Sequence, residues 1–111
     1  MFLRALAGRN AFDRLFDQGR RLRLGWLTLI CLPNGLSGTR FGCAIRKGVC
    51  KTAVRRNRVK RWIREGFRKH RSICPPGWDM VLLVQKVPDD LNFETTEKQI
   101  CNLLKSKELK Q

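Results

Sequence analysis

Several residue types and patterns that mark common protein classes are scarce in this chain of 111 residues. It carries only 9 acidic side chains against 24 lysines and arginines, and one histidine. No stretch approaches the roughly 20 apolar residues of a membrane-spanning helix, and the longest apolar-rich run, residues 26–32, has the length of a strand. Arg4 interrupts the opening residues before a signal-peptide apolar region can form. We therefore expect neither a membrane span nor a secretion signal.

The cysteines do not form a pattern typical of disulfides or of zinc sites. Five are present, an odd number at wide spacing and mostly among apolar neighbours: Cys31, Cys43, Cys50, Cys74 and Cys101. This usage is typical of reduced core cysteines in a cytoplasmic protein. No cysteine pair has close metal-ligand spacing, and one histidine supplies neither a metal site nor a nucleophile–base pair. We expect no catalytic residue and no metal site in this chain, so an autonomous nuclease is disfavoured.

Charge and size point to one folded domain with a polyanionic partner. Hydrophobic residues make up 42% of the chain, which is enough for a core, and 111 residues fit a single domain over 1–111. The formal net charge is +15, which repels itself unless a partner of opposite charge is bound. Residues 46–71 hold 12 of the 24 basic residues and only one acid, Glu65. A nucleic acid is the expected partner, and this segment is its expected contact.

Local patterns predict the order of helices and strands. Asn10 is a good N-cap and Gly19 a good stop for a helix over 10–18. Residues 20–32 favour extended structure broken at Gly25, and a turn-rich segment at 33–38 leads to a strand over 40–46 that we expect to pair antiparallel with the preceding strand. A long helix over 52–71, a strand over 78–87 and a helix over 94–105 follow.

The strand, helix and strand over 40–87 predict a crossover unit with a partly parallel sheet. We expect the helices to cover one side of that sheet, as a two-layer α+β fold.

The helix over 52–71 is amphipathic in an unusual way. Its apolar residues share one face, and the opposite face carries Asn57, Arg61, Arg64 and Arg68. Guanidinium groups grip phosphate oxygens in a bidentate fork, so regularly spaced arginines follow a nucleic-acid backbone. The alternative is a basic helix that is merely solvated. Such a helix normally mixes charges of both signs, whereas this one has a single acid.

The same segment resembles a known signature. Lys47, then AVRRNRVKR at 53–61 and IREGFR at 63–68, closely resemble the RNR motif of the protein subunit of bacterial ribonuclease P. The segments at 12–16 with Gly19, at 40–42 and at 77–82 resemble that family's first helix and the strands before and after the motif. The resemblance therefore covers nearly the whole chain in order.

This resemblance implies both a fold and an activity. The family fold is an α+β two-layer sandwich with a four-stranded mixed sheet and three helices, in the order α-β-β-β-α-β-α, with a left-handed βαβ crossover. The implied activity is removal of the 5′ leader from precursor transfer RNA, in which a large RNA with bound Mg²⁺ is the catalyst and the protein assists. The implied partners are that RNA and the precursor, bound by one protein copy in the bacterial cytoplasm, with no membrane and no DNA.

The resemblance also implies which residues bind RNA. Phe12 and Phe16 match aromatic positions of the cleft that takes the single-stranded leader, although two phenylalanines four residues apart are also typical of plain core. The signature helix and the basic loop before it contact the catalytic RNA. This set comprises Arg46, Lys47, Lys51, Arg55, Arg56, Asn57, Arg58, Lys60, Arg61, Arg64 and Arg68.

Four positions need separate interpretation. Gly48 stands where the family commonly has a second lysine, and Arg46 is the candidate to replace its charge. Ile30 stands at a leader-cleft position that is often aromatic, and Trp26 is the candidate to compensate. We interpret Trp62 as core and His70 as a surface residue without a partner.

Two other classes of protein share some of these features. A ribosomal or RNA-chaperone protein has the basic helix without any preference for precursor leaders. A reader of double-stranded DNA is a weaker alternative, because no helix with a short turn precedes residues 52–71. Stimulation of leader removal discriminates the first alternative from the ribonuclease P reading.

Overall fold

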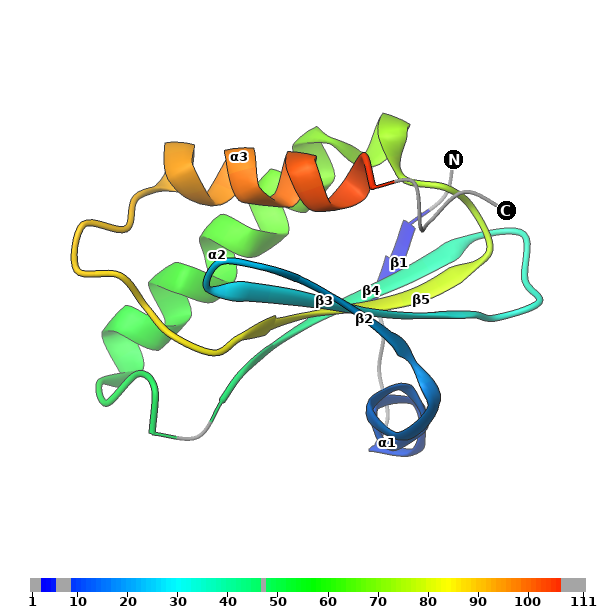
Figure 1. Cartoon of the computed structure of the whole chain (residues 1–111), viewed down its shortest axis with the longest axis horizontal. Coiled ribbons are helices and arrows are strands. Elements are labelled where there is room, and N and C mark those ends of the chain that lie inside the picture. The colour runs from blue at the N-terminus through cyan, green and yellow to red at the C-terminus, as the bar shows by residue number, and fades with distance from the viewer. Residues whose placement is uncertain (1–2, 6–8, 47, 107–111) are drawn as a thin grey trace.

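The fold is seen in a computed structural model, which describes residues 3–5, 9–46 and 48–106, with side chains from Asn10 onward (Figure 1). The elements in chain order are β1 (Leu3–Ala5), α1 (Arg9–Gln18), β2 (Arg20–Leu24), β3 (Leu27–Pro33), β4 (Thr39–Ile45), α2 (Ala53–Lys69), a short 3₁₀ helix (Arg71–Ile73), β5 (Trp78–Val84) and α3 (Phe93–Leu104). The predicted helices and the break at Gly25 are confirmed, with ends that differ by one or two residues.

One mixed sheet contains all the strands, in the order β1-β4-β5-β3-β2. The predicted antiparallel pairing of β3 with β4 is wrong, because β5 lies between them, antiparallel to β3 and parallel to β4. The physical reason is burial: six of the seven residues of β5 are buried, and only a central strand covered on both faces provides that environment. The crossover from β4 through α2 to β5 is left-handed (Figure 1).

The sheet has one strand more than the four that the sequence predicts. β1 pairs in parallel with β4, with Leu3 opposite Thr39 and Ala5 opposite Phe41. It satisfies backbone groups along an otherwise open edge of β4. A strand of three residues carries too little periodicity to be recognised in a sequence, which explains why it was not predicted.

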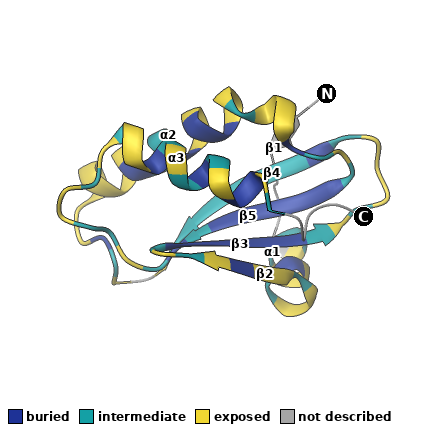
Figure 2. Cartoon of the chain, turned by 45° about the horizontal axis from the view of Figure 1, so that its top comes forward, coloured by how far each residue is buried: buried dark blue, intermediate teal, exposed yellow. Residues whose placement is uncertain are grey.

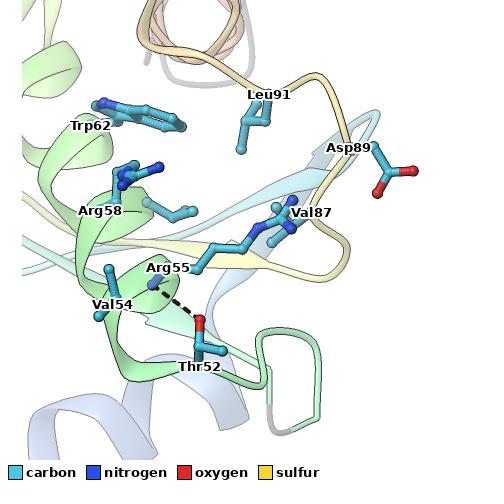
Figure 3. Close-up of a pocket in the computed structure, with 9 residues that line it drawn as sticks. Thr52, Val54, Arg55, Arg58, Trp62, Val87, Asp89 and Leu91 are labelled. Carbon is cyan, nitrogen blue, oxygen red and sulfur yellow. Dashed lines mark hydrogen bonds between the residues drawn. The ribbon is translucent and has the colours of Figure 1, made fainter.

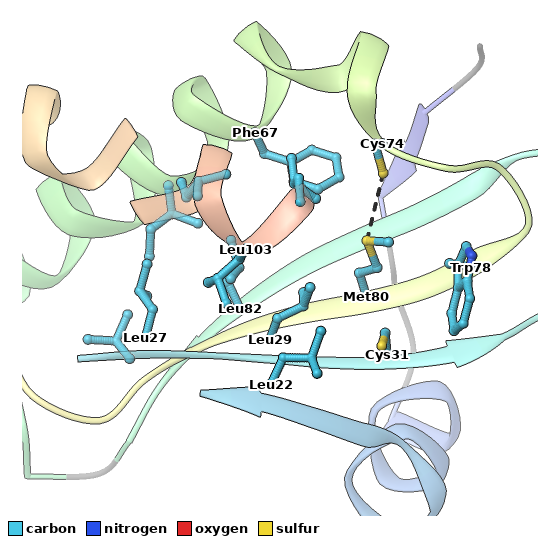
Figure 4. Packing of buried hydrophobic residues seen from close by; sticks show 14 of the residues in the cluster. Leu22, Leu27, Leu29, Cys31, Phe67, Cys74, Trp78, Met80, Leu82 and Leu103 are labelled. Atoms are coloured by element: carbon cyan, nitrogen blue, oxygen red, sulfur yellow. Dashed lines mark hydrogen bonds between the residues drawn. The ribbon is translucent and has the colours of Figure 1, made fainter. Parts of the chain in front are cut away.

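The helices lie on both faces of the sheet, so the expectation that they cover one side is wrong. α2 and α3 cover one face, and α1 lies on the other (Figures 1 and 2). The larger core lies under α2 and α3 and includes Leu29, Met80 and Leu82 of the sheet with Phe67 of α2 (Figure 4). Successive side chains of a strand point to opposite faces, so neighbouring Ile30 and Val81 form a second cluster under α1.

A close approach fixes α1 against the sheet. At Gly19, directly after α1, an added Cβ atom would lie 2.7 Å from Cγ2 of Ile30 and 2.5 Å from the backbone oxygen of Leu15. Only glycine fits such a gap. Leu15 itself is buried against Ile30 and Val81, so α1 is held near the middle of the sheet by a small apolar contact.

The end of α2 is tied to α3 by charged groups. Nε2 of His70 lies 3.1 Å from Oε1 of Glu97, and Nζ of Lys69 lies 3.0 Å from the same oxygen. The prediction of a partnerless surface histidine is therefore wrong, because a contact across 27 residues leaves no local signal. A hydrogen bond from Lys69 holds the pKa of Glu97 below its usual value.

All five cysteines lie in the described part of the chain, and no disulfide joins any two of them there. Cys31, Cys50 and Cys74 are buried, and Cys43 and Cys101 are half-buried. Burial raises the pKa of the Cys74 thiol to about 12, so this thiol stays protonated at neutral pH. Its sulfur lies 3.7 Å from that of Met80 within the larger core (Figure 4).

Candidate nucleic-acid interface

The outer face of α2 presents the predicted row of polar and basic side chains to solvent. We call Asn57, Arg61, Arg64 and Arg68 the outer stripe; all four are exposed, while Val59, Ile63 and Phe67 on the opposite face are buried. Thr52 is the N-cap and accepts a hydrogen bond from the backbone N–H of Arg55. The predicted amphipathic division of this helix is therefore confirmed.

A second row of cations lies where α2 passes β4. Burial raises the pKa of the Cys43 thiol on β4. The charges of Arg64 and Lys60 lower the same pKa by a smaller amount, because both cations lie close to this thiol. One turn earlier, Nη2 of Arg56 donates to the backbone oxygen of Cys50 at 3.4 Å. The basic surface therefore extends from the outer stripe toward the edge of the sheet.

The loop before α2 adds exposed charge. Arg46 and Lys51 are both exposed, whereas Lys47 lies outside the described residues. Gly48 has a φ of +86°, a conformation in which a lysine would be strained. The exposed Arg46 is available to replace the charge that is missing at Gly48.

The third side of α2 faces the segment between β5 and α3. Arg55 and Arg58 line a cavity there together with Trp62 (Figure 3). Trp62 is half-buried, so its interpretation as core is only partly correct. Trp62 lies at the margin of the apolar face of α2. The periodicity of the sequence does not show how far a neighbouring loop covers a residue at that margin.

The two candidate leader residues lie on the other side of the molecule. Phe12 and Phe16 of α1 are both half-buried and pack beside Leu15 against the sheet. Leu32, Ala44 and Leu83 are partly buried on the same sheet face. Both phenylalanines thus belong to the rim of the smaller apolar cluster, neither fully exposed nor fully buried.

Two neighbouring aromatic expectations turn out differently. Ile30 is completely buried beneath α1, so it offers no contact surface there. Trp26 packs against the larger core under α2 and α3, so the expectation that it compensates for Ile30 is wrong. The tight turn at Gly25, which has a φ of +60°, sets the direction of the Trp26 side chain. Strand alternation does not continue across such a turn, so it could not predict this direction.

Basic residues of β2 border this surface, and they were not among the RNA-binding residues predicted from the sequence. Arg21 and Arg23 are exposed and pair with Ile30 and Thr28, which places them on the α1 side of the sheet. The guanidinium carbon of Arg21 lies 5.9 Å from the centre of the Phe16 ring, and its Nη2 donates to the Phe16 backbone oxygen at 3.1 Å. The alternation in RRLRL is a signal that could have found them.

An ion pair between a half-exposed arginine and a buried aspartate lies on the same sheet face. Arg40 of β4 donates to both carboxylate oxygens of Asp79 on β5, at 2.7 and 2.6 Å, and Asn34 donates to one of them at 3.0 Å. Burial raises the pKa of Asp79, but these hydrogen bonds more than offset it and hold the pKa below its usual value. The guanidinium group of Arg40 is therefore engaged in a structural contact within the fold.

The acidic residues of the described ranges do not assemble a metal site. Within 3–5, 9–46 and 48–106, no three side chains of histidine, cysteine, aspartate or glutamate gather in a way that could hold a metal ion. These residues do not fit a protein-held Mg²⁺. In the same ranges, no helix is long and apolar enough to cross a bilayer.

Fold and surface together define a small RNA-binding protein. An arginine-bearing helix packs on a mixed sheet, cations line its exposed sides, and half-buried aromatic side chains lie on α1. A family model described as ribonuclease P matches residues 3–108. The chain belongs to the ribonuclease P protein family.

Known proteins agree with this assignment. The ribonuclease P protein component of Thermotoga maritima is 33% identical over 101 residues, which cover 87% of this chain and 86% of that protein. The solved structure of the Thermotoga maritima RNase P protein superimposes with a TM-score of 0.82 at 31% identity, covering 91% of this chain and 94% of that one. The Staphylococcus aureus protein, with 22% identity, 95% coverage of both chains and a TM-score of 0.82, shares the fold.

Family membership defines the function at the level of the assembly. The protein is a subunit of an endoribonuclease holoenzyme, and its family acts in processing the 5′ end of transfer RNA.

Proposed function

We propose that α2 and the loop before it bind the catalytic RNA, and that the α1-bearing face of the sheet binds the 5′ leader of precursor transfer RNA. The RNA with its Mg²⁺ carries out the cleavage, and this chain supplies no group to the reacting atoms. In this proposal one protein copy acts in a bacterial cytoplasmic ribonucleoprotein, and neither DNA nor a membrane takes part.

The charge around α2 supports the first contact. Its exposed cations include Arg61 and Arg64 on the outer stripe, and Arg56 continues the row toward β4. A helix that is basic on three sides fits into a fold of RNA where phosphates approach from several directions. Affinity then comes mainly from the release of counterions, and it falls steeply with salt.

The surface beside α1 supports the second contact. Single-stranded RNA is bound without sequence preference by aromatic rings that stack on bases and by cations that follow the backbone. Phe12 and Phe16 provide the rings, and Arg21 and Arg23 provide cations at the adjoining edge. The combination of accessible rings and neighbouring arginines carries this part of the proposal.

The decisive experiment is cleavage of precursor transfer RNA at low Mg²⁺ by a bacterial ribonuclease P RNA, with and without this protein. We expect a strong gain with the protein, which grows with leader length until the leader covers the α1-bearing face of the sheet. No gain, together with tight but indiscriminate RNA binding, would contradict the proposal and favour a general RNA chaperone.

A matched pair of variants tests the leader surface. Replacing both Phe12 and Phe16 by leucine keeps apolar volume but removes the rings, so we expect the dependence on leader length to be lost. Stacking contributes about 1–3 kcal/mol per base, so long-leader precursor should bind about tenfold more weakly. Phe93→Leu, at the start of α3 on the opposite face, is the control. If the double variant at Phe12 and Phe16 and the Phe93→Leu control lose the same affinity for long-leader precursor, the leader does not bind at α1.

A further inference from the structure

The cavity lies on the third side of α2, apart from the outer stripe and from the α1-bearing face, and two of its lining residues, Arg55 and Arg58, belong to the basic set of the proposed contact with the catalytic RNA. It has a volume of about 270 Å³ and lies between the first half of α2 and the segment from Val87 to Leu91. Figure 3 shows Trp62 and Leu91 at one end and Thr52 at the other, with Arg55 and Arg58 between them. The cavity thus lies between α2 and the segment that precedes α3, and none of its lining residues belongs to α1.

Its walls combine two kinds of surface. Val59, Val87 and Leu91 are apolar, and Trp62 adds a half-exposed indole. Arg55 and Arg58, both exposed, contribute planar guanidinium groups beside this apolar surface. An aromatic face next to guanidinium forks matches a planar base joined to a phosphate. At about 270 Å³ the cavity lies just below the usual lower limit of ligand pockets, roughly 300 Å³, so its size suits no more than one base with its phosphate left at the open rim.

The two arginines have donor capacity that the fold leaves unused. Nη2 of Arg55 donates to the backbone oxygen of Pro88 at a long 3.3 Å. Neither Arg55 nor Arg58 forms an ion pair within the described part of the chain. The one acid at the cavity, Asp89, is exposed, and its carboxylate points away from the other lining residues (Figure 3). Two arginines against one aspartate leave the wall of the cavity with a net positive charge.

We propose that this cavity binds one unpaired nucleotide of RNA, with the base against Trp62 and the phosphate at Arg55 and Arg58. That the nucleotide belongs to RNA rests on the proposed function, whereas the base-and-phosphate chemistry rests on the cavity alone. It follows that α2 holds RNA in two ways: phosphates along its outer stripe and one base on its α3 side.

Titration of the full chain with adenosine 5′-monophosphate tests this proposal, read by tryptophan fluorescence. We expect the nucleotide to quench the fluorescence, and the change to disappear in Trp62→Phe, which keeps an aromatic ring but removes the reporting indole. Arg58→Ala should weaken binding about tenfold, because it removes a charge-assisted contact. Adenosine without phosphate should bind more weakly than the monophosphate by a similar factor.

The matched control is Arg71→Ala, which removes the same charge from an exposed position beyond the far end of α2. It should change nucleotide affinity less than twofold. Equal weakening by Arg58→Ala and Arg71→Ala would mean general charge attraction and would overturn the proposal. Quenching that persists in Trp62→Phe, or no binding of the monophosphate, would overturn it as well.

This outcome is separable from that of the cleavage experiment. A protein that stimulates leader removal but shows no Trp62-dependent nucleotide binding retains the proposed function and loses the nucleotide cavity. A protein that binds the monophosphate at Trp62 without stimulating cleavage retains the cavity and loses the proposed function.

Discussion

At the scale of single residues, Asp79 stands out because it is the one buried acid among the residues that the structure describes. Its charge is compensated by Arg40 and Asn34, which come from two other segments of the chain. A carboxylate left alone in such a place would be costly, so the ion pair makes the position of β4 beside β5 specific.

Replacing Arg40 by methionine should destabilise the protein by about 2–3 kcal/mol. The variant leaves the Asp79 carboxylate buried without its cation. Because Arg40 is one-third exposed, the loss of unfolding free energy stays below that of a fully buried ion pair. Chemical denaturation measures the change, and Arg23→Met on the exposed edge strand is the control, expected within about 0.5 kcal/mol.

The same pair sets a pH dependence. Because the folded pKa of Asp79 lies below its unfolded value of about 3.9, the carboxylate contributes stability above that pH and loses it as pH falls through the folded pKa. A protonated Asp79 needs no cation, so the difference between the native protein and Arg40→Met should shrink on acidification. A difference that stays constant from pH 7 to pH 3 would show that Arg40 acts through packing alone.

The sequence predicts residues well where the signal is local. Thr52 caps α2 as a threonine before a helical pattern should, and the outer stripe follows from helical spacing. The pairing of His70 with Glu97 and the direction of Trp26 depend on distant segments, so local patterns gave the wrong answer. The roles of the individual RNA-binding residues remain predictions.

At the scale of elements, the contact between α2 and α3 depends on a glycine within a helix. An added Cβ atom at Gly66 would lie 2.9 Å from Cδ1 of Ile100 and 3.5 Å from Cα of Glu97. Glycine costs a helix about 1 kcal/mol relative to alanine, so its presence here is explained by the closeness of the two axes.

Gly66→Ala should therefore not give the usual gain in helix stability. We expect a net loss of about 1 kcal/mol, since overpacking costs about 1–3 kcal/mol and exceeds the gain in propensity. Ile100→Val removes the Cδ1 atom, so the double variant should be more stable than the sum of the two single changes. Thermal unfolding of all four proteins measures this coupling, and strict additivity would rule out the steric explanation.

The salt dependence of RNA binding tests the role of the outer stripe. Arg61→Ala and Arg64→Ala should each reduce the slope of log K against log salt by about one for binding to ribonuclease P RNA, because each removes one phosphate contact. The control is Lys98→Ala on α3, an exposed cation already paired with Glu94 at 3.5 Å. Unchanged slopes in both arginine variants would remove this face of α2 from the interface.

Elements were easier to predict than their arrangement. The apolar run in β5 indicates a strand buried on both faces, and this same property places it between β3 and β4. The prediction assigned neighbouring strands to each other because consecutive strands usually pair, and here burial outweighs that tendency. The position of α1 on the opposite face follows from the same two-sided burial.

At the scale of the whole molecule, the net charge of +15 on 111 residues opposes folding. An anion that binds the native state alone stabilises it by mass action, about 1.4 kcal/mol at ten times its Kd. Sulfate should therefore raise the Tm by about 5 °C beyond sodium chloride of equal ionic strength.

The comparison isolates binding from screening, because both salts screen charge equally at equal ionic strength. A double variant, Arg61→Ala with Arg64→Ala, should show a smaller increment from sulfate if the outer stripe supplies part of the anion site. Identical melts in the two salts would show that simple screening accounts for the stabilisation.

The central place of β5 also affects the order in which the chain can fold during synthesis. β2 and β3 can pair as soon as they emerge, but β4 has no partner on its inner side until residues 78–84 follow. The arginine-bearing helix leaves the ribosome before that strand, at a time when no complete sheet exists to support it. A nascent chain that ends before β5 therefore displays its cations on an unsupported helix, and RNA binding with native geometry begins only once about three-quarters of the protein has been made.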